Sequence, residues 1–164
     1  MRLLVRAPLA GALLPLALLS AGCEMMIAGP RAQASDQWEK TYAVAPGARL
    51  EIENTNGGID VRVHAQPTIQ VLAHRTARAV TEQGARELLS RTTLEESASP
   101  DLVRLVTPRH SGPSMGQRVD VRYEIKVPST LAVKLTTVNG KIALEGVTGS
   151  VALETVNGGI DARD

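Results

Sequence analysis

Apolar and polar residues alternate with a period of two along most of the chain from residue 48 onward. In such a pattern successive side chains point to opposite faces of a sheet, so one set is buried and the other meets water. The clearest example is residues 119–127, where Val, Tyr and Ile alternate with charged residues. The pattern predicts β-strands at residues 49–53, 59–64, 69–73, 93–97, 102–106 and 119–127.

A single stretch, residues 80–91, departs from this alternation. Ala85, Leu88 and Leu89 follow the spacing i, i+3, i+4, which places them on one face of a helix. Thr81 precedes them with a side chain suited to an N-cap. The sequence therefore predicts one short helix inserted among the strands.

The C-terminal third contains a repeat. Thr-Val-Asn-Gly at 137–140 recurs at 155–158, an offset of 18 residues, and ETVNGGID at 154–161 is similar to ENTNGGID at 53–60. Short strands separated by Gly turns at fixed spacing are typical of stacked repeats, in which each strand pair buries its apolar face against the next.

The repeated Asn-Gly pairs have two interpretations. Both residue types tolerate the left-handed backbone of a tight turn, so a structural role in turns, with bonds to neighbouring backbone, is the simpler one. The alternative is a ladder of Asn side chains that binds a ligand or calcium. Each Asn is followed by Gly, as turn chemistry requires, and this favours the structural role. The expected turn residues are Asn56, Gly57, Asn139, Gly140, Asn157 and Gly158.

The repeated Val-Asn-Gly units, the preceding Val127-Pro128 and the inserted helix resemble a bacterial family of β-strand-repeat domains, the putative adhesin family, whose function is undefined. The resemblance covers residues 48–164. It implies an all-β fold at the cell envelope, either a parallel β-solenoid or an elongated β-sandwich of short repeated strands, and it brings no catalytic residues. The last strand begins at residue 159 with no turn or cap after it. We therefore expect either that the sequence is truncated or that a strand of a partner pairs with this one.

Residues 1–22 have the pattern of an export signal. Arg2 and Arg6 precede an uncharged, apolar run over 7–22. A membrane-spanning helix is the alternative, but that run is shorter than the roughly 20 residues a helix needs to cross a bilayer. It also contains two prolines, which weaken a long helix.

The leader ends in Leu19-Ser20-Ala21-Gly22-Cys23, which resembles the lipobox of bacterial lipoproteins. In that family the Cys is acylated, with palmitate among the expected chains, and becomes the N-terminus after cleavage. Ser20 departs from the aliphatic residue that is usual there. The resemblance implies that Cys23, the sole cysteine, is the lipidation site. An unmodified signal peptide with an incidental cysteine is the alternative.

The rest of the chain divides into two parts. Residues 23–47 are rich in small and polar residues and predict a flexible tether, and residues 48–164 form the predicted β-repeat domain. Without Arg2 and Arg6, Lys plus Arg falls from 18 to 16 against 17 Asp plus Glu, a net charge of −1. A nucleic-acid partner would call for a clustered basic face, so none is expected. Sites that stack sugars or bases depend on aromatic faces, and the chain has three such residues, Trp38, Tyr42 and Tyr123.

Candidate chemistry is sparse. The three histidines, His64, His74 and His110, have no metal-binding spacing, so neither a zinc site nor any other cofactor is expected. Asp60 and Asp161 each follow Gly-Gly-Ile and could act as an acid–base pair on a sugar. Position 143 has the same place in the repeat and is Ala. This favours the simpler interpretation that Asp60 and Asp161 occupy solvent-facing positions.

We therefore expect a lipid-anchored envelope protein with a non-catalytic binding, adhesin-like or structural role. Its expected partners are the membrane, through the lipid, and envelope proteins or polysaccharide. A polysaccharide-active β-helix enzyme and a regulatory lipoprotein that reports envelope stress are the alternatives.

Overall fold

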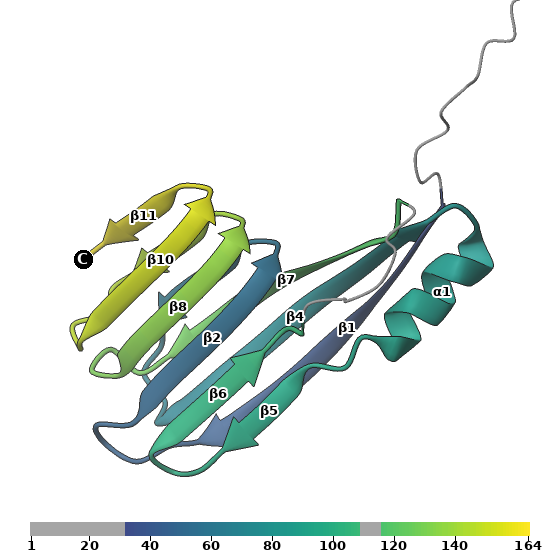
Figure 1. Cartoon of the computed structure of the whole chain (residues 1–164). Coiled ribbons are helices and arrows are strands. Elements are labelled where there is room, and N and C mark those ends of the chain that lie inside the picture. Colours follow the sequence, from purple (N-terminus) through teal and green to yellow (C-terminus); the bar gives the residue numbers. More distant parts are fainter. Residues whose placement is uncertain (1–31, 109–115) are drawn as a thin grey trace, which may run out of the picture.

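The computed structural model describes residues 32–108 and 116–164, which form strands and one helix (Figure 1). The all-β class with a single inserted helix is thereby confirmed. The elements are β1 (Ala32–Ala43), β2 (Arg49–Asn56), β3 (Ile59–Val63), β4 (Thr68–Ala79), α1 (Glu82–Arg91), β5 (Glu95–Ala98), β6 (Leu102–Val106), β7 (Arg118–Val127), β8 (Ala132–Asn139), β9 (Ile142–Glu145), β10 (Val151–Asn157) and β11 (Ile160–Arg163).

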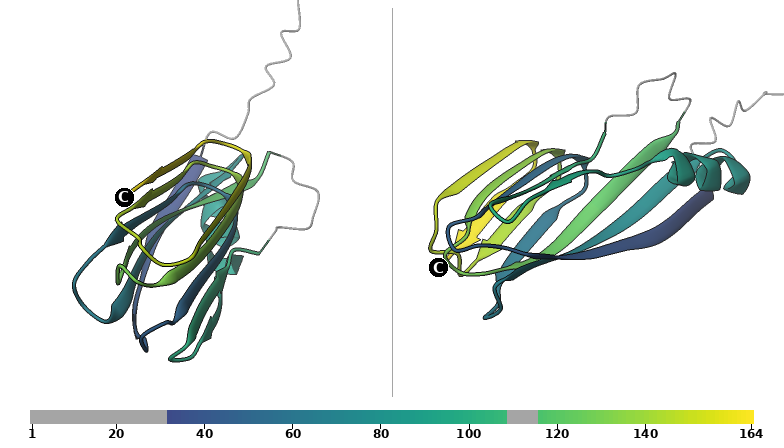
Figure 2. Two further views of the ribbon diagram at one scale, coloured as in Figure 1. Left: turned by 90° about the vertical axis from the view of Figure 1, so that its left-hand side faces the viewer. Right: turned by 90° about the horizontal axis from the view of Figure 1, so that it is seen from below.

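The strands form two mixed sheets that face each other (Figure 2). The six-stranded sheet has the order β1-β4-β7-β3-β9-β11, and the five-stranded sheet has the order β10-β8-β2-β6-β5. One continuous core of aliphatic side chains and two tyrosines fills the space between them. Tyr123, on β7, is the largest of the fully buried side chains in this core.

The repeated segments stack as the sequence suggested, but the chain does not form a solenoid. Each repeat unit crosses from the five-stranded sheet to the six-stranded sheet, and β2/β3, β8/β9 and β10/β11 lie in parallel register on one another. We call each of these three strand pairs a coil. Elsewhere β1, β4 and β7 pair antiparallel, as do β5 and β6. Parallel pairing also joins β2 to β6 and β3 to β7, so it extends from β6 and β7 to β10 and β11 and does not reach β1, β4 or β5.

The expected tether over 23–47 is wrong from Ala32 onward. Strand β1 pairs antiparallel with β4 along its full length, from Ala32 opposite Ala79 to Ala43 opposite Thr68. Its inward positions include Ala34, Trp38 and Tyr42, which pack against the core. The small alanine side chains concealed the period-two pattern, so the composition resembled that of a linker.

The helix begins and packs as expected. The Thr81 hydroxyl accepts a hydrogen bond from the Gly84 amide at 3.0 Å, which caps the N-terminus. Ala85, Leu88 and Leu89 are buried, and α1 lies against β1 and β4.

Arg75, on β4, connects this region. Its guanidinium donates to both carboxylate oxygens of Asp36 on β1, and it also donates to the Thr92 carbonyl oxygen at 2.6 Å. Asp36 occupies an inward position on β1, where an acid is costly without a partner. One arginine thus links both long strands to the end of the helix.

Candidate functional site

The Asn-Gly pairs lie at the corners where the three coils cross between the sheets, and we call them the corner ladder. The Asn139 amide donates to the side-chain oxygen of Asn56, and the Asn157 amide donates to that of Asn139, each at 2.9 Å. The Asn56 amide donates to the carbonyl oxygen of Val119 on β7 at 3.3 Å. The amides therefore satisfy one another from coil to coil, and Asn56 joins the ladder to the neighbouring strand.

The glycines of the corner ladder allow the coils to approach closely. A Cβ placed on Gly140 would lie well under 3.0 Å from the carbonyl oxygen of Gly57, and one on Gly158 would meet that of Gly140 in the same way. The hydroxyls of Thr137 and Thr155 donate to the same two carbonyl oxygens, at 3.1 and 3.0 Å. The Thr-x-Asn-Gly repeat is thus a contact motif between successive coils.

The predicted turn geometry is wrong in one respect. Among the described residues, only glycines have a positive φ. The backbone of Asn56, Asn139 and Asn157 is therefore not in the left-handed conformation. Gly57 has a φ of +112°, whereas no positive φ occurs at Gly140 or Gly158. The side-chain oxygens of Asn56 and Asn139 already accept hydrogen bonds from the Asn amides of the next coil. This favours the structural role of the corner ladder over ligand binding.

The outer face of the six-stranded sheet carries two rows of side chains aligned across its strands. The acidic row contains Glu39, Leu72, Glu124, Asp60, Ala143 and Asp161, in the order β1 to β11. The basic row beside it contains Thr41, Gln70, Lys126, Arg62, Glu145 and Arg163. Because adjacent strands lie about 4.8 Å apart, side chains within a row are close neighbours.

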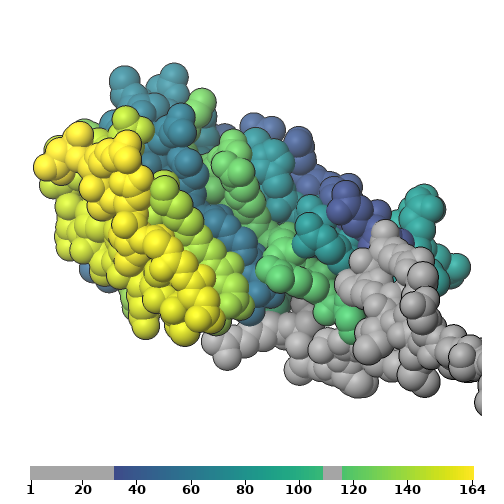
Figure 3. All heavy atoms as spheres, turned by 90° about the horizontal axis from the view of Figure 1, so that it is seen from above, coloured from purple at the N-terminus to yellow at the C-terminus, as the bar shows by residue number. Residues whose placement is uncertain are grey.

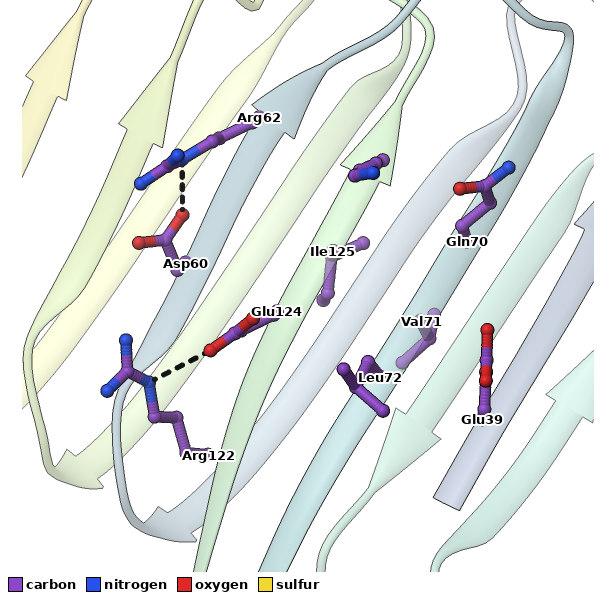
Figure 4. Close-up of a pocket in the computed structure, with 10 residues that line it drawn as sticks. Glu39, Asp60, Arg62, Gln70, Val71, Leu72, Arg122, Glu124 and Ile125 are labelled. Atoms are coloured by element: carbon purple, nitrogen blue, oxygen red, sulfur yellow. Dashed lines mark hydrogen bonds and ion pairs between the residues drawn. The ribbon is translucent and has the colours of Figure 1, made fainter. Parts of the chain in front are cut away.

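A groove of about 330 Å³ lies where these rows cross β1, β4, β7 and β3 (Figure 4). Leu72 is half-buried and supplies an apolar side chain between the two charged rims. The groove is lined by Glu39, Asp60, Arg62, Gln70, Val71, Leu72, Arg122, Glu124, Ile125 and Lys126.

Ion pairs hold part of this groove in place and leave other charges unpaired. Arg62 Nε lies 3.2 Å from Asp60 Oδ1, and Arg122 Nε lies 3.6 Å from Glu124 Oε1 (Figure 4). Lys126 and Glu39 are exposed, and within the described part of the chain neither forms an ion pair. Within the described residues, Lys126 and Glu39 are therefore an unpaired cation and an unpaired anion on either side of Leu72.

Asp60 and Asp161 share the acidic row, but Ala143 stands between them. Their backbones are two strand spacings apart, about 10 Å. Lys141 Nζ and Arg163 Nη2 lie 3.2 and 3.0 Å from Asp161 Oδ2, and the hydrogen bond from Lys141 lowers the pKa of that carboxyl most. A general acid needs the opposite shift, so Asp161 is not suited to that role.

The histidines are separate from one another. His64 Nε2 donates to the Thr68 carbonyl oxygen at 2.7 Å, at the end of β3. His74 lies on the outer face of β4, between Gln37 and Glu124. His110 is outside the described residues. Over residues 32–108 and 116–164, no three His, Cys, Asp or Glu side chains are placed to hold a metal ion.

Cys23 and the leader also lie outside the described residues, so the structure neither places the thiol nor describes the leader. In the part of the chain that is described, no helix has the length and hydrophobicity to cross a bilayer. Sequence reasoning missed the groove, because Glu39 lay in the supposed tether and the pairing of β7 with β4 and β3 was unknown. Trp38 and Tyr42, which fall on the same side of an extended chain, were the signal that could have revealed β1.

No family model and no curated protein matches the chain. Among solved structures, the chain is similar to a putative cell adhesion protein from Clostridium sporogenes ATCC 15579, with 10% identity and a TM-score of 0.41. The similarity covers 78% of this chain and 59% of that protein, so the chain spans little more than half its length. At that TM-score the similarity carries no conclusion about function.

Proposed function

We propose that the chain is a non-catalytic binding domain of the bacterial cell envelope, anchored through a lipid on Cys23, that binds another protein with the groove around Leu72. The leader and its lipobox-like end support the anchoring half of this proposal. The groove and its charges support the binding half.

The observation that carries the binding proposal is the pair of free charges beside Leu72. Interface cores favour an apolar anchor, and a polar rim with complementary charges fixes orientation. A fitting partner presents a basic side chain to Glu39, an acidic one to Lys126 and an apolar one over Leu72. The Asp60–Arg62 and Arg122–Glu124 pairs keep their own charges satisfied and so define which charges are available.

The positions of the aromatic residues favour a protein over a polysaccharide as the partner. Tyr42 and Tyr123 are buried, and Trp38 packs against the core. None of these three rings lines the groove. Sugar rings commonly stack on aromatic faces, and the described surface of the groove offers none.

A site-specific crosslinking experiment tests the proposal. The full chain, with its leader, carries a photo-crosslinking residue at Gln70 inside the groove or, as a control, at the exposed Lys134 on the five-stranded sheet. We expect a discrete, protease-sensitive adduct from position 70 in intact cells and none from position 134.

Charge reversal makes this test specific. Glu39→Lys with Lys126→Glu should lower the yield of the adduct at least fivefold, whereas reversal of the exposed Lys134 should leave it unchanged. Equal adducts from positions 70 and 134, adducts to glycan alone, or a yield that ignores the charge reversal would each refute protein binding at the groove.

A further inference from the structure

Strand β1 forms one edge of the six-stranded sheet, at the opposite end of the strand order from the C-terminal coil. In the space-filling view its atoms (purple) lie along the margin of the molecule, far from the last coil (yellow) (Figure 3). Among the described residues, β4 is the only strand that pairs with β1. The other side of β1, which we call the β1 edge, is therefore open to pairing with another strand.

The β1 edge lacks the features that usually prevent strand addition. Natural edge strands are commonly very short, or are interrupted by a proline or a bulge. Strand β1 instead has 12 residues, contains no proline and pairs with β4 in one unbroken register from Ala32 to Ala43. On the same side of the molecule, β5 is the edge of the five-stranded sheet and has 4 residues. Of these two edges, only the β1 edge is long and regular.

The two charged side chains that point inward from β1 are already paired. Asp36 accepts hydrogen bonds from Arg75, and Lys40 Nζ donates to both carboxylate oxygens of Glu96 on β5 at 2.7 Å. An unpaired inward charge would resist a neighbouring strand, but these two charges are neutralised within the protein. Trp38 lies between them, also points inward and is only partly buried. An apolar residue on an added strand would cover the exposed part of this ring.

The backbone of β1 directs alternate residues to its open side. The Val44 amide donates to the Pro67 carbonyl oxygen at 3.3 Å, in the pair directly after the last paired residues of β1 and β4. In antiparallel strands, pairs that exchange hydrogen bonds alternate with pairs that do not. The even-numbered residues of β1 therefore bond to β4. The amides and carbonyls of the odd-numbered residues over 33–43 point to the β1 edge.

The same odd-numbered residues carry their side chains on the outer face of the sheet, where the groove lies. Ser35 Oγ lies 3.1 Å from Thr76 Oγ1, and Gln37 Nε2 lies 3.4 Å from His74 Nδ1, so both side chains are bonded to β4. Glu39 lines the groove and has no such partner within the described residues. A strand beside β1 would bring a side chain of its own directly opposite this carboxylate.

We propose that the protein bound at the groove adds an extended segment to the β1 edge, antiparallel to β1, with Lys or Arg opposite Glu39 and an aliphatic residue opposite Trp38. This inference rests on the proposed function, because the groove and the β1 edge meet at Glu39. Main-chain hydrogen bonds supply the affinity of such an addition, and alternate side chains supply its specificity. Antiparallel pairing is the more stable arrangement per residue, and it places the basic residue directly before the aliphatic one in the added segment.

A second copy of the chain fits the β1 edge less well. The outward residues of β1 are Gln33, Ser35, Gln37, Glu39, Thr41 and Ala43. None of them is basic, so the pairing of two β1 strands would leave both Glu39 carboxylates without a cation. The charge of the edge therefore favours a different polypeptide.

A proline at Gln37 tests strand addition. The Gln37 amide points to the β1 edge, so Gln37→Pro removes a hydrogen bond to an added strand and none to β4, and sheets tolerate proline at such edge positions. Gln37 does not line the groove, and Gln37→Ala is the matched control that loses the same side chain. With the photo-crosslinking residue at Gln70 in the full chain, Gln37→Pro should lower the yield of the adduct at least fivefold relative to Gln37→Ala.

Crosslinking along the β1 edge tests the same proposal without a proline. Photo-crosslinking residues are placed one at a time at Ser35 and at Ala43 in the otherwise unchanged chain, and mass spectrometry maps the adducts formed in intact cells. We expect both adducts on one segment of the partner, in reverse order and as far apart in sequence as the two positions on β1. Circular dichroism shows whether Gln37→Pro is folded, and if it is not, this mapping decides alone.

Three results would overturn strand addition. The first is an adduct from position 70 that persists in a folded Gln37→Pro variant and still depends on Glu39 and Lys126, which would retain the groove as the binding site. The second is a pair of adducts from positions 35 and 43 on unrelated segments or on the chain itself. The third is the absence of any adduct from position 70 in the wild type, which would overturn the proposed function as well.

Discussion

The side-chain amide of Asn139 donates to the side-chain oxygen of Asn56 although 83 residues separate them in the chain. Helix α1 and strands β3 to β7 lie between these two positions in the sequence, yet their coils are direct neighbours in both sheets. The contact therefore depends on the whole intervening segment returning to the correct register.

Asn139→Ala should destabilise the protein, because Asn139 is the one corner residue bonded to an Asn on both sides. Its loss leaves part-buried polar groups without partners, and the expected cost is about 1–3 kcal/mol in the free energy of unfolding. Urea unfolding followed by circular dichroism measures it. Asn157→Ala removes one exposed bond and should cost under about 1 kcal/mol; equal losses for the two variants would contradict the ladder.

Gly140→Ala should be far more harmful than Gly159→Ala. The new Cβ at 140 would overlap the Gly57 carbonyl oxygen, whereas nothing lies within 4 Å of the equivalent position on Gly159. Overpacking of this kind costs about 1–3 kcal/mol or more, and the substitution at 159 should be neutral within about 0.5 kcal/mol. Thermal unfolding of both variants is the measurement, and similar melting temperatures would argue against close coil contact.

Arg75→Met should destabilise the region where the helix meets the long strands. The variant leaves Asp36 without its partner and removes the bond to the Thr92 carbonyl oxygen. The Asp36 side chain is 39% exposed, so solvent screening limits the expected loss to about 1–3 kcal/mol. Arg86→Met breaks an ion pair on the helix surface and should change stability by no more than about 0.5 kcal/mol. An equal effect of the two variants in urea unfolding would contradict a linking role for Arg75.

Stability should fall as pH rises from about 10 to about 12. Burial raises the pKa of Tyr123 from its ordinary value of 10.0 to about 12, so in that range the unfolded chain has lost a proton that the folded chain still holds. The unfolded state then binds fewer protons, and the free energy of unfolding decreases with pH. Tyr123→Phe, measured by urea unfolding at pH 9 and pH 11, should reduce this decrease. An unchanged pH dependence in the variant would refute the assignment to Tyr123.

Cys23→Ser should abolish membrane attachment, because the expected lipid is linked through the Cys23 thiol. In cells the variant should remain unprocessed or be released to the soluble fraction, and intact-mass analysis of the wild type should show the mass of the acyl chains. Ser20→Leu, which restores the aliphatic residue usual at that position, should be processed at least as well as the wild type. A Cys23→Ser protein that is processed and retained like the wild type would exclude lipid anchoring.

Local patterns predicted the elements of this fold better than their pairing. The helix with its Thr81 cap and the strand at 119–127 are confirmed, since each depends on side chains near in sequence. Strand β1 was missed because alanines at inward positions conceal alternation. The corner at Asn56-Gly57 was taken for a tight turn, although it leads into the facing sheet rather than back along the same one.

The groove could not be predicted, because it depends on register between distant strands. Glu39, Leu72 and Glu124 share a row only once β4 has paired with both β1 and β7. Nothing local in the sequence distinguishes these residues from other solvent-facing positions on a strand. Thr-x-Asn-Gly was recognisable as a repeat in the sequence. Its role as a contact between coils depends on where the Gly57 and Gly140 carbonyl oxygens lie, which the sequence does not show.

The corner glycines also bear on how such a protein could change in length over evolution. One side of the stack is closed, because Gly57 already abuts the Val121 carbonyl oxygen on β7, and duplications there would disrupt the groove as well. On the other side, duplication of one 18-residue unit would bring its own Thr, Asn and Gly in the correct phase. Homologues could thus vary in their number of coils while keeping the groove around Leu72.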